Sequence, residues 1–374
     1  MNSKYRVYAS LEGKPVDRNP VTVLYNQLYF QDHFSELTGR PQWQMQSWLY
    51  STPDEYLQVF TRMIDQVPFE ILQPELAPTR HSLAHTGFIE QDGRHYLLDR
   101  VDNTLTLLDS ISGHAKDYVA NETQHVFNKQ DVIEWVKVMP ATKMIASGQI
   151  DYIDAVVSKF GKDHFILSGG VVGVIYECGH YVGQTNALAM LLEQPELIDY
   201  LSQRITEQNI ETIRALASAG GDAIYIDDAT ATSDMISAST YQRFSLPYIK
   251  TMVEEIHRLN HKAIVIYFGG VSDRLDLIIE TGADGFAMET SMKNYTNDIY
   301  TISQKIGSRM TLFGNIDPLG LLQDGSDSEL EAEINRQASA GRLARGFIMS
   351  TGSPITPSTP LRRVQRFLEL ARTI

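Results

Sequence analysis

The chain has 374 residues, of which 43% are hydrophobic and 21% are charged, and its formal net charge is −14 at pH 7. This composition indicates a globular protein and argues against a nucleic-acid-binding surface, which would need clustered Lys and Arg. The single cysteine, Cys178, excludes an internal disulfide framework and a metal site built from several cysteines. No apolar run is long enough to span a bilayer, and the opening MNSKYRVYASLEGK lacks an apolar signal core, so we expect a cytoplasmic protein that does not enter membranes.

The first 110 residues contain two kinds of pattern. Residues 1–80 predict helices joined by polar connections. Residues 86–110 alternate apolar stretches with the pairs Asp92–Gly93 and Asp102–Asn103, which are typical of tight turns. This second pattern predicts a small antiparallel β meander.

Beyond about residue 130, helical patterns alternate with short apolar runs. The runs that we predict as strands are 164–170, 222–228, 263–270, 284–290, 310–318 and 346–352. Strands that alternate with helices predict βα units and a parallel sheet.

An internal repeat refines the fold class. Residues 219–227 read AGGDAIYID and residues 281–289 read TGADGFAME, so each copy has a Gly at a helix end and a strand that ends in a carboxylate. The chain has no G-x-G-x-x-G or Walker loop, which a doubly wound nucleotide-binding sheet should show. We therefore expect an α/β fold, a single (β/α)8 TIM barrel over 1–374, with N-terminal helices and the meander in 1–130 and the main βα repeats in 131–374.

Active sites of such barrels lie at the carboxyl ends of the strands, which gives a list of candidate residues. The candidates after the strands are Asp227, Asp228, Tyr267, Phe268, Glu289, Asn315, Asp317 and 350–353, and the loop after 164–170 adds Tyr176, Glu177, Cys178, His180 and Tyr181. Each has a structural alternative, such as a helix cap for the carboxylates or a buried apolar position for the cysteine. Adjacent Asp227 and Asp228 point to opposite sides of their strand, so at most one of them faces a ligand.

Several segments resemble the superfamily of uroporphyrinogen decarboxylases and the cobalamin-dependent methyltransferases related to them. The segments are RVYASLEGKPVDRNPV with Arg6, Asp17, Arg18 and Pro20 in place, LLEQPELIDYL, ISASTYQRFSLPYIK, GSRMTLFGNIDPLGLL and GFIMSTGSPITPSTP. GNIDP is the most specific of them, and together they extend over nearly the whole chain. The resemblance implies a (β/α)8 barrel with its site at the strand ends, in agreement with the reading of the residues.

The zinc-dependent methyltransferases of this superfamily carry a His-x-Cys-Gly motif and a further Cys as zinc ligands. The matching positions here are Ile266, Phe268 and Ser353, so the usual zinc site is absent. A zinc site built from His180, Glu289 and Asp228 is an alternative set of nitrogen and oxygen ligands.

The decarboxylases carry an arginine-rich N-terminal segment that binds the carboxylates of the substrate, and their catalytic positions correspond to Glu75, Tyr176, Asp228 and Ser353 here. Residues 21–40 contain a single arginine, Arg40. A porphyrinogen bears many carboxylates, which a site without cations in an acidic protein would repel. The sequence therefore disfavours uroporphyrinogen as the substrate.

The first hypothesis is a methyltransferase that moves a methyl group between a small O-, N- or S-methyl compound and a corrinoid (cobalamin) on a separate partner protein. We expect Glu289, Asp228, His180 and Glu75 to activate the leaving heteroatom. Tyr267 and Phe268 would shape an aromatic pocket suited to a quaternary ammonium group. The other expected substrate-binding residues are Tyr176, Asn315 and Ser353. The alternatives are a decarboxylase that acts on a smaller substrate and a non-catalytic ligand-binding barrel. The resemblance also suggests a homodimer.

Overall fold

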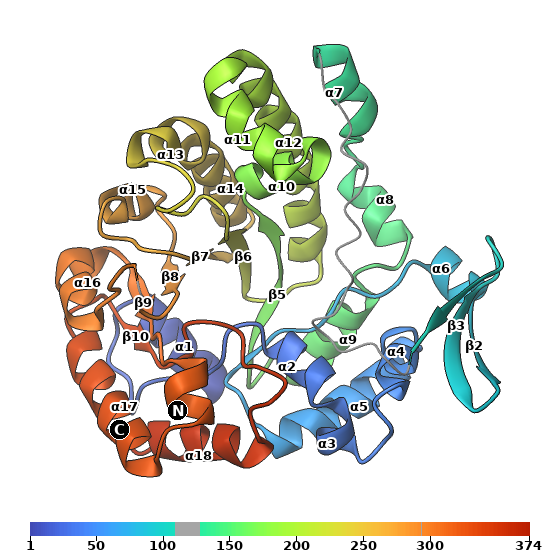
Figure 1. The fold of residues 1–374 in the computed structure, drawn as a ribbon. Helices are drawn as coiled ribbons and strands as arrows, with labels where there is room; N and C mark the ends of the chain where they lie inside the picture. Colours follow the sequence, from blue (N-terminus) through green and yellow to red (C-terminus); the bar gives the residue numbers. More distant parts are fainter. Residues whose placement is uncertain (109–127, 293) are drawn as a thin grey trace.

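A computed structural model of the chain describes residues 1–108, 128–292 and 294–374. Its larger sheet consists of parallel strands that curl around a common axis (Figure 1). In spatial order the strands are β1 (Ile71–Leu72), β5 (Phe165–Val172), β6 (Ala223–Asp228), β7 (Lys262–Tyr267), β8 (Gly285–Met288), β9 (Thr311–Phe313) and β10 (Phe347–Ile348). All six strands predicted from the sequence are therefore present, several of them shorter than expected.

A short extended segment joins the two edges of this sheet. The Met349 N–H donates to Pro20 O at 2.8 Å, and the Thr22 N–H donates to Met349 O at 2.9 Å. On the other side the Glu70 N–H donates to Val21 O at 3.2 Å. The segment 20–22 thus takes the place of an eighth strand between β10 and β1, and the TIM-barrel fold predicted from the sequence is confirmed.

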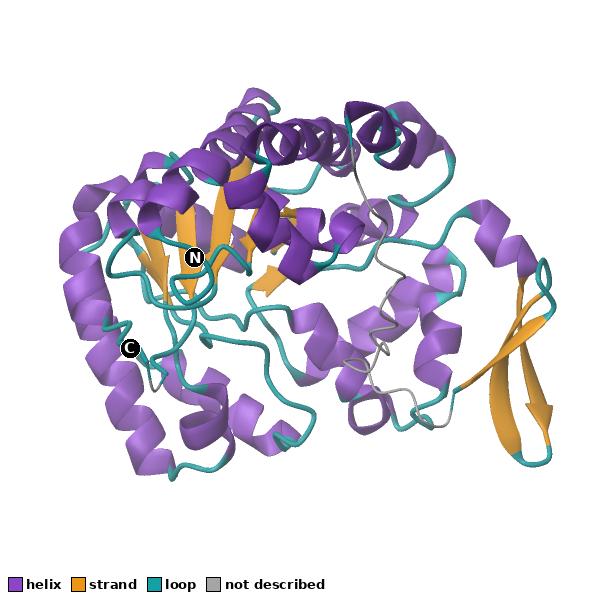
Figure 2. Ribbon diagram, turned by 45° about the horizontal axis from the view of Figure 1, so that its top comes forward, coloured by secondary structure: helices purple, strands orange, loops and turns teal. Residues whose placement is uncertain are grey.

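Most of the helices lie on the outer side of the barrel (Figure 2). The helices of the N-terminal half are α1 (Ser3–Leu11), α2 (Asn26–Asp32), α3 (Phe34–Thr38), α4 (Gln44–Leu49), α5 (Pro53–Gln66), α6 (Arg80–His85), α7 (Lys129–Trp135), α8 (Ala141–Ala146) and α9 (Asp151–Phe160). The remainder are α10 (Val174–Val182), α11 (Gln184–Glu193), α12 (Pro195–Ser218), α13 (Ala238–Phe244), α14 (Leu246–Arg258), α15 (Leu275–Glu280), α16 (Ile299–Ile306), η1 (Gly307–Arg309), the π-helix η2 (Pro318–Gln323), α17 (Asp327–Gly341) and α18 (Leu361–Ala371).

The predicted meander is also present, as a separate three-stranded antiparallel sheet. Its strands are β2 (Thr86–Gln91), β3 (Arg94–Asp99) and β4 (Thr104–Leu107), and the sheet projects from the barrel beside α6 (Figure 1). Asp92 and Gly93 both have positive φ, as the tight turn predicted there requires. The last two residues of the predicted range, 109 and 110, lie outside the described residues.

Side chains alternate between the two faces of the barrel strands. On β7 the side chains of Ile264 and Ile266 point into the barrel, whereas Val265 and Tyr267 pack outward against the helices. Helix α1 closes the amino-terminal end of the barrel with Val7 and Leu11, which belong to the interior cluster. The opposite end, where the strands finish, is the end that can hold a site.

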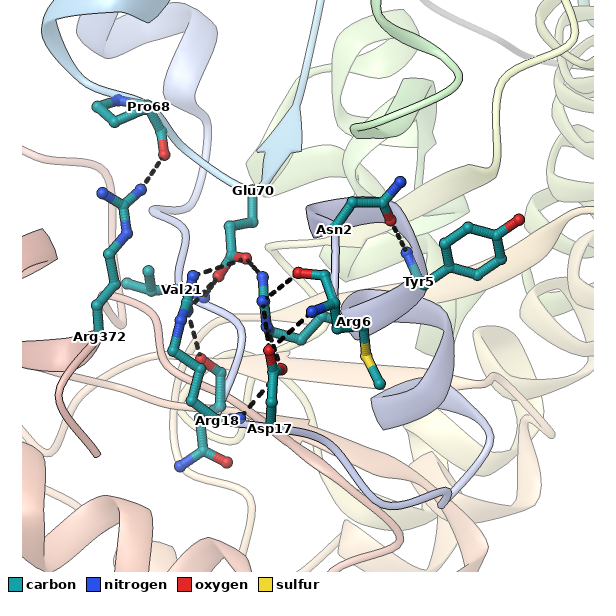
Figure 3. Close-up of polar contacts among 11 residues, drawn as sticks. Asn2, Tyr5, Arg6, Asp17, Arg18, Val21, Pro68, Glu70 and Arg372 are labelled. Atoms are coloured by element: carbon teal, nitrogen blue, oxygen red, sulfur yellow. Dashed lines mark hydrogen bonds and ion pairs between the residues drawn. The ribbon is translucent and has the colours of Figure 1, made fainter.

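A buried ion-pair network lies at the amino-terminal end of the barrel (Figure 3). Glu70, 1% exposed, forms ion pairs with Arg6 and Arg18 and accepts a hydrogen bond from the Val21 N–H at 2.8 Å. Arg6 also donates to Asp17 at 2.7 Å. The network ties α1 and the barrel-closing segment to the start of β1, so both arginines of the N-terminal motif are engaged away from the strand ends.

The two copies of the internal repeat have the same local geometry, and both lie at the amino-terminal end of the barrel. Gly220 and Gly282 have φ of 75° and 77°, as the left-handed helix caps predicted there require. Asp222 accepts a hydrogen bond from the Ile166 N–H at 2.8 Å, and Asp284 accepts one from the Ala263 N–H at 2.9 Å. Each aspartate therefore links its own strand to the preceding one.

Candidate active site

Three aromatic rings lie at the carboxyl end of the barrel interior, and we call Tyr25, Tyr225 and Phe268 the aromatic cluster. Tyr225 comes from β6, Phe268 follows β7, and Tyr25 precedes α2. The rings of Tyr25 and Phe268 are nearly parallel, with centroids 6.3 Å apart and planes 16° apart. The Tyr225 ring stands edge-on to Tyr25 at 6.1 Å. Tyr225 and Phe268 stay partly exposed although they belong to the interior cluster, so they line accessible space.

A carboxyl group lies beside this cluster. The Tyr25 hydroxyl donates to Asp227 Oδ2 at 2.5 Å, while Asp227 Oδ1 is buried without a hydrogen-bond partner among the described residues. Burial raises the pKa of Asp227 to about 6, although the Tyr25 hydroxyl and the Ala229 N–H act in the opposite direction. A carboxyl group with this pKa can exchange a proton near neutral pH.

The backbone of Tyr25 is unusual. Its φ of 53° and ψ of 50° place it in the left-handed region, which non-glycine residues seldom adopt. Such strain persists only where the surroundings fix it, and it concentrates at functional sites. Here the conformation places the Tyr25 ring over the barrel interior and its hydroxyl on Asp227.

Asp228, the neighbouring carboxylate, lies on the opposite side of β6. It is 1% exposed, and the Ser245 hydroxyl approaches both of its oxygens at 3.3 Å. Burial raises the pKa of Asp228 to about 7. The structure thus places Asp227 at the barrel interior, whereas Asp228, which the sequence analysis favours, packs among the surrounding helices.

Tyr267 likewise lies outside the barrel interior. It is fully buried, and its hydroxyl donates to Ala231 O at 3.0 Å. The buried Arg274 donates to the same oxygen and to Ile236 O, each at 2.7 Å. Tyr267 and Arg274 therefore fix the loop after β6, and of the two aromatic residues expected in the pocket only Phe268 joins the cluster.

Glu289 and Asn315 are bound to neighbouring loops. One Glu289 oxygen accepts hydrogen bonds from the Gly269 N–H at 2.9 Å and from the Tyr295 hydroxyl. The Asn315 amide donates to Asn297 O at 2.9 Å and to Glu289 O at 3.3 Å. These contacts hold the segments after β7, β8 and β9 together.

The other predicted residues lie around the strand ends. Glu75 follows β1, accepts a hydrogen bond from the Gln31 amide, and helps to raise the pKa of Tyr225, which places its charge near the aromatic cluster. His180 is exposed on α10 and contacts the Tyr176 ring edge-on at 5.0 Å. Ser353 is partly exposed in the loop after β10. The structure therefore places Glu75 near Tyr225 and Phe268 against Tyr25, both at the aromatic cluster, whereas His180 lies exposed against Tyr176.

The residue types at the usual zinc positions do not fit a metal. Ile266 is buried in the barrel interior, and Phe268 belongs to the aromatic cluster. Across the described ranges, no three His, Cys, Asp or Glu side chains are grouped to hold an ion, so His180, Glu289 and Asp228 are not assembled as a ligand set. Burial raises the pKa of the Cys178 thiol to about 12, which disfavours the thiolate that a metal would need.

The sequence analysis did not single out Tyr25. Left-handed backbone is usually signalled by Gly or Asn, and Tyr25 carries neither signal. Its closeness to Asp227 depends on a contact between residues that are 202 positions apart. The strand-end rule does give Asp227, but it does not show which of the paired aspartates faces inward.

Comparisons with known proteins agree with this architecture. The profile of the family described as Uroporphyrinogen decarboxylase (URO-D) matches residues 116–374. The chain is 29% identical to the uroporphyrinogen decarboxylase of Coxiella burnetii over 243 residues, which cover 62% of this chain and 64% of that enzyme. It is 24% identical to the methylcobamide:CoM methyltransferase MtbA of Methanosarcina acetivorans over 250 residues, which cover 67% of this chain and 70% of that enzyme.

A solved methyltransferase structure from Methanosarcina mazei has the same fold. It superposes with a TM-score of 0.71 and 18% identity, over 100% of this chain and 99% of that chain. Both decarboxylases and methyltransferases are thus among the relatives, and these relatives are enzymes. Among the described helices, none has the length and apolar character needed to cross a membrane.

Proposed function

The chain belongs to the uroporphyrinogen decarboxylase (URO-D) family, and within this family we propose that it is a methyltransferase. It moves a methyl group between a small methylated compound and a corrinoid carried by a separate protein. The observation that carries the proposal is the pairing of the aromatic cluster with Asp227, a buried carboxyl group that has one unpartnered oxygen.

The residues at the strand ends suit this transfer. When the methyl group leaves a heteroatom, that atom keeps the electron pair of the broken bond, and a proton on it makes it a better leaving group. Asp227 can hold that proton at its unpartnered Oδ1, because its pKa lies close to neutral pH. Tyr25 fixes the orientation of the carboxyl group through Oδ2. A corrinoid carried by the partner would supply the nucleophilic cobalt to which the methyl group passes.

The distribution of cations favours methyl transfer over decarboxylation of a polycarboxylate. Arg6 and Arg18 bind Glu70 at the opposite end of the barrel. Arg274 is bound to loop carbonyls on the outer side of the sheet. No cationic side chain among the described residues contributes to the pKa of Asp227. A substrate with many carboxylates would therefore meet carboxyl groups and rings rather than arginines.

The relatives give independent support. The MtbA enzyme, named for transfer between a methylcobamide and CoM, aligns over most of its own length. The family also includes decarboxylases, so we retain decarboxylation of a smaller substrate as the competing reaction. Zinc has no part in the proposal, because Ile266, Phe268 and Ser353 cannot supply the thiolate and imidazole ligands.

The test uses the purified chain under anaerobic conditions with reduced cobalamin as a soluble substitute for the partner. Methyl ethers, methyl thioethers and methylated amines are offered in turn, and methylation is followed by visible absorbance. We expect methylation with one donor class, and a loss of about 10²–10⁴-fold in rate for Asp227→Asn. Asp54→Asn, at an exposed position on α5, is the matched control and should keep the full rate.

A parallel assay measures CO₂ release from small aromatic and pyrrole carboxylic acids. Release that depends on Asp227 and needs no cobalamin would replace the proposal with a decarboxylase. Ligand binding without either reaction would indicate the non-catalytic barrel.

A further inference from the structure

The aromatic cluster and its carboxyl groups point to one class of methyl-bearing substrate. We propose that the end of the barrel interior binds an N-methylated ammonium ion, either quaternary or protonated tertiary. As a statement about the methyl donor this rests on the proposed function, with one difference: an ammonium nitrogen leaves as a neutral amine without receiving a proton, so for this donor Asp227 acts as the ionised partner of the cation and not as the acid. As a statement about binding it can be tested separately.

The ring geometry is the first argument. A cation is attracted to the face of an aromatic ring within about 6 Å of the centroid. The Tyr25 and Phe268 rings are nearly parallel at 6.3 Å, and Tyr225 stands almost perpendicular to Tyr25 at 6.1 Å. Rings this close leave no gap between them for a methylated ammonium ion, so the ion would lie beside the cluster, against the partly exposed surfaces of Tyr225 and Phe268. Methyl groups on nitrogen spread the positive charge over an apolar surface, which suits such a lining.

The polar groups beside the rings are the second argument. Asp227 Oδ1 is buried without a partner among the described residues, and Glu75 is close enough to affect the pKa of Tyr225. The Tyr25 hydroxyl already donates to Asp227 Oδ2. The site therefore offers an acceptor and negative charge, which an ammonium ion can use.

Other donor classes fit less well. An ether oxygen or a thioether sulfur can only accept hydrogen bonds, so it gains nothing from Asp227 Oδ1 when the carboxyl group is ionised. A carboxylated donor would be repelled by Asp227 and Glu75. A protonated tertiary amine could donate its N–H to Oδ1, and a quaternary ion would gain from the charge alone.

The experiment is calorimetric titration of the full chain with choline and with its uncharged isostere 3,3-dimethylbutan-1-ol. The two probes have the same shape and differ in charge. We expect choline to bind at least about tenfold more tightly, as several cation–π contacts and a nearby carboxylate would give. Equal affinity for the two probes, or no measurable binding of choline at millimolar concentration, would overturn the inference.

Two variants locate the binding. Phe268→Leu keeps an apolar side chain of similar reach but removes the ring. It should therefore weaken the affinity for choline several-fold and leave the affinity for the alcohol unchanged. Phe88→Leu in the meander is the matched control and should change neither affinity. If Phe268→Leu affects both probes equally, the ring contributes only shape and the inference fails.

The binding and turnover results separate the two proposals. Methylation of cobalamin by an ether or thioether, without preferential choline binding, would support the methyltransferase proposal and refute the proposal that the site binds an ammonium ion. Preferential choline binding, with no methyl transfer from any donor, would support the ammonium-binding site and refute the methyltransferase proposal.

Discussion

The two ends of the barrel differ in how many partners their buried carboxyl groups have. At the amino-terminal end, Glu70 is bound by two arginines and a backbone N–H. At the carboxyl end, Asp227 has a single side-chain donor, an unpartnered oxygen and a raised pKa. The first arrangement stabilises the fold, whereas the second leaves binding capacity unused in the folded chain. The contrast indicates that the strand starts serve stability and the strand ends serve function.

The largest effect is expected from Glu70→Gln. The substitution leaves Arg6, 5% exposed, without its buried carboxylate partner. Breaking a buried ion pair on one side costs about 3–5 kcal/mol. Urea unfolding should show this loss, and Glu331→Gln at an exposed position on α17 should change the free energy of unfolding by less than about 0.5 kcal/mol. A loss below about 1 kcal/mol for Glu70→Gln would contradict the stabilising role of this network.

Asp227→Asn should instead increase the free energy of unfolding at alkaline pH. Because the pKa of Asp227 is raised in the folded state, the folded chain holds this proton more tightly than the unfolded chain. Its contribution to stability is therefore fully present below about pH 4 and is lost as the pH rises through about 6. The neutral variant should gain about 1–3 kcal/mol at pH 8 and nothing at pH 4. Urea unfolding across this range checks the sign, and a destabilised variant at pH 8 would refute it.

Tyr25→Phe should have a smaller effect on stability. It removes the donor to Asp227 Oδ2 but keeps the ring, so the free energy of unfolding should fall by about 1 kcal/mol. Because the hydroxyl lowers the pKa of Asp227, that pKa should rise further in the variant. Carboxyl titration by NMR or infrared spectroscopy measures this shift, and Tyr5→Phe on the exposed face of α1 is the control. An unchanged pKa would mean that the hydroxyl does not control the carboxyl group.

The smallest effect is expected from His180→Ala. His180 is exposed on α10, where its ring contacts the Tyr176 ring edge-on. Its removal should change the free energy of unfolding by less than about 0.5 kcal/mol. The same variant tests the catalytic role predicted from the sequence, because a large loss of methyl transfer with intact stability would support that role.

The sequence predicts most of this architecture because its signals are local. Alternation in residues 86–110 predicts the meander, and apolar runs between helical patterns predict the parallel strands. The barrel-closing segment 20–22 was not predicted, since it is short, begins at Pro20 and has no flanking helix pattern. Strand β1, with two residues, has the same difficulty.

The site is harder to predict from the sequence because its key contacts join residues that are far apart along the chain. The strand-end rule selects the pair Asp227 and Asp228, and alternation puts Asp227 on the same face of the strand as Tyr225, but only the tertiary structure shows that this face is the barrel interior. Tyr267 and Phe268 present the same ambiguity on β7, and the tertiary structure assigns one to each side. Tyr25 carries no local signal, since a tyrosine seldom adopts the left-handed backbone that it has here.

The barrel-closing segment also bears on how the chain folds during synthesis. The Leu24 N–H donates to the Thr351 hydroxyl across 327 residues, directly beside the bridge between Val21 and Met349. A contact of such sequence separation cannot form until β10 has emerged from the ribosome, although its other half is made first. Tyr25 immediately follows this segment. The aromatic cluster can therefore be completed only after β10 has emerged, and until then Tyr25 is present in the nascent chain but is not yet held over Asp227.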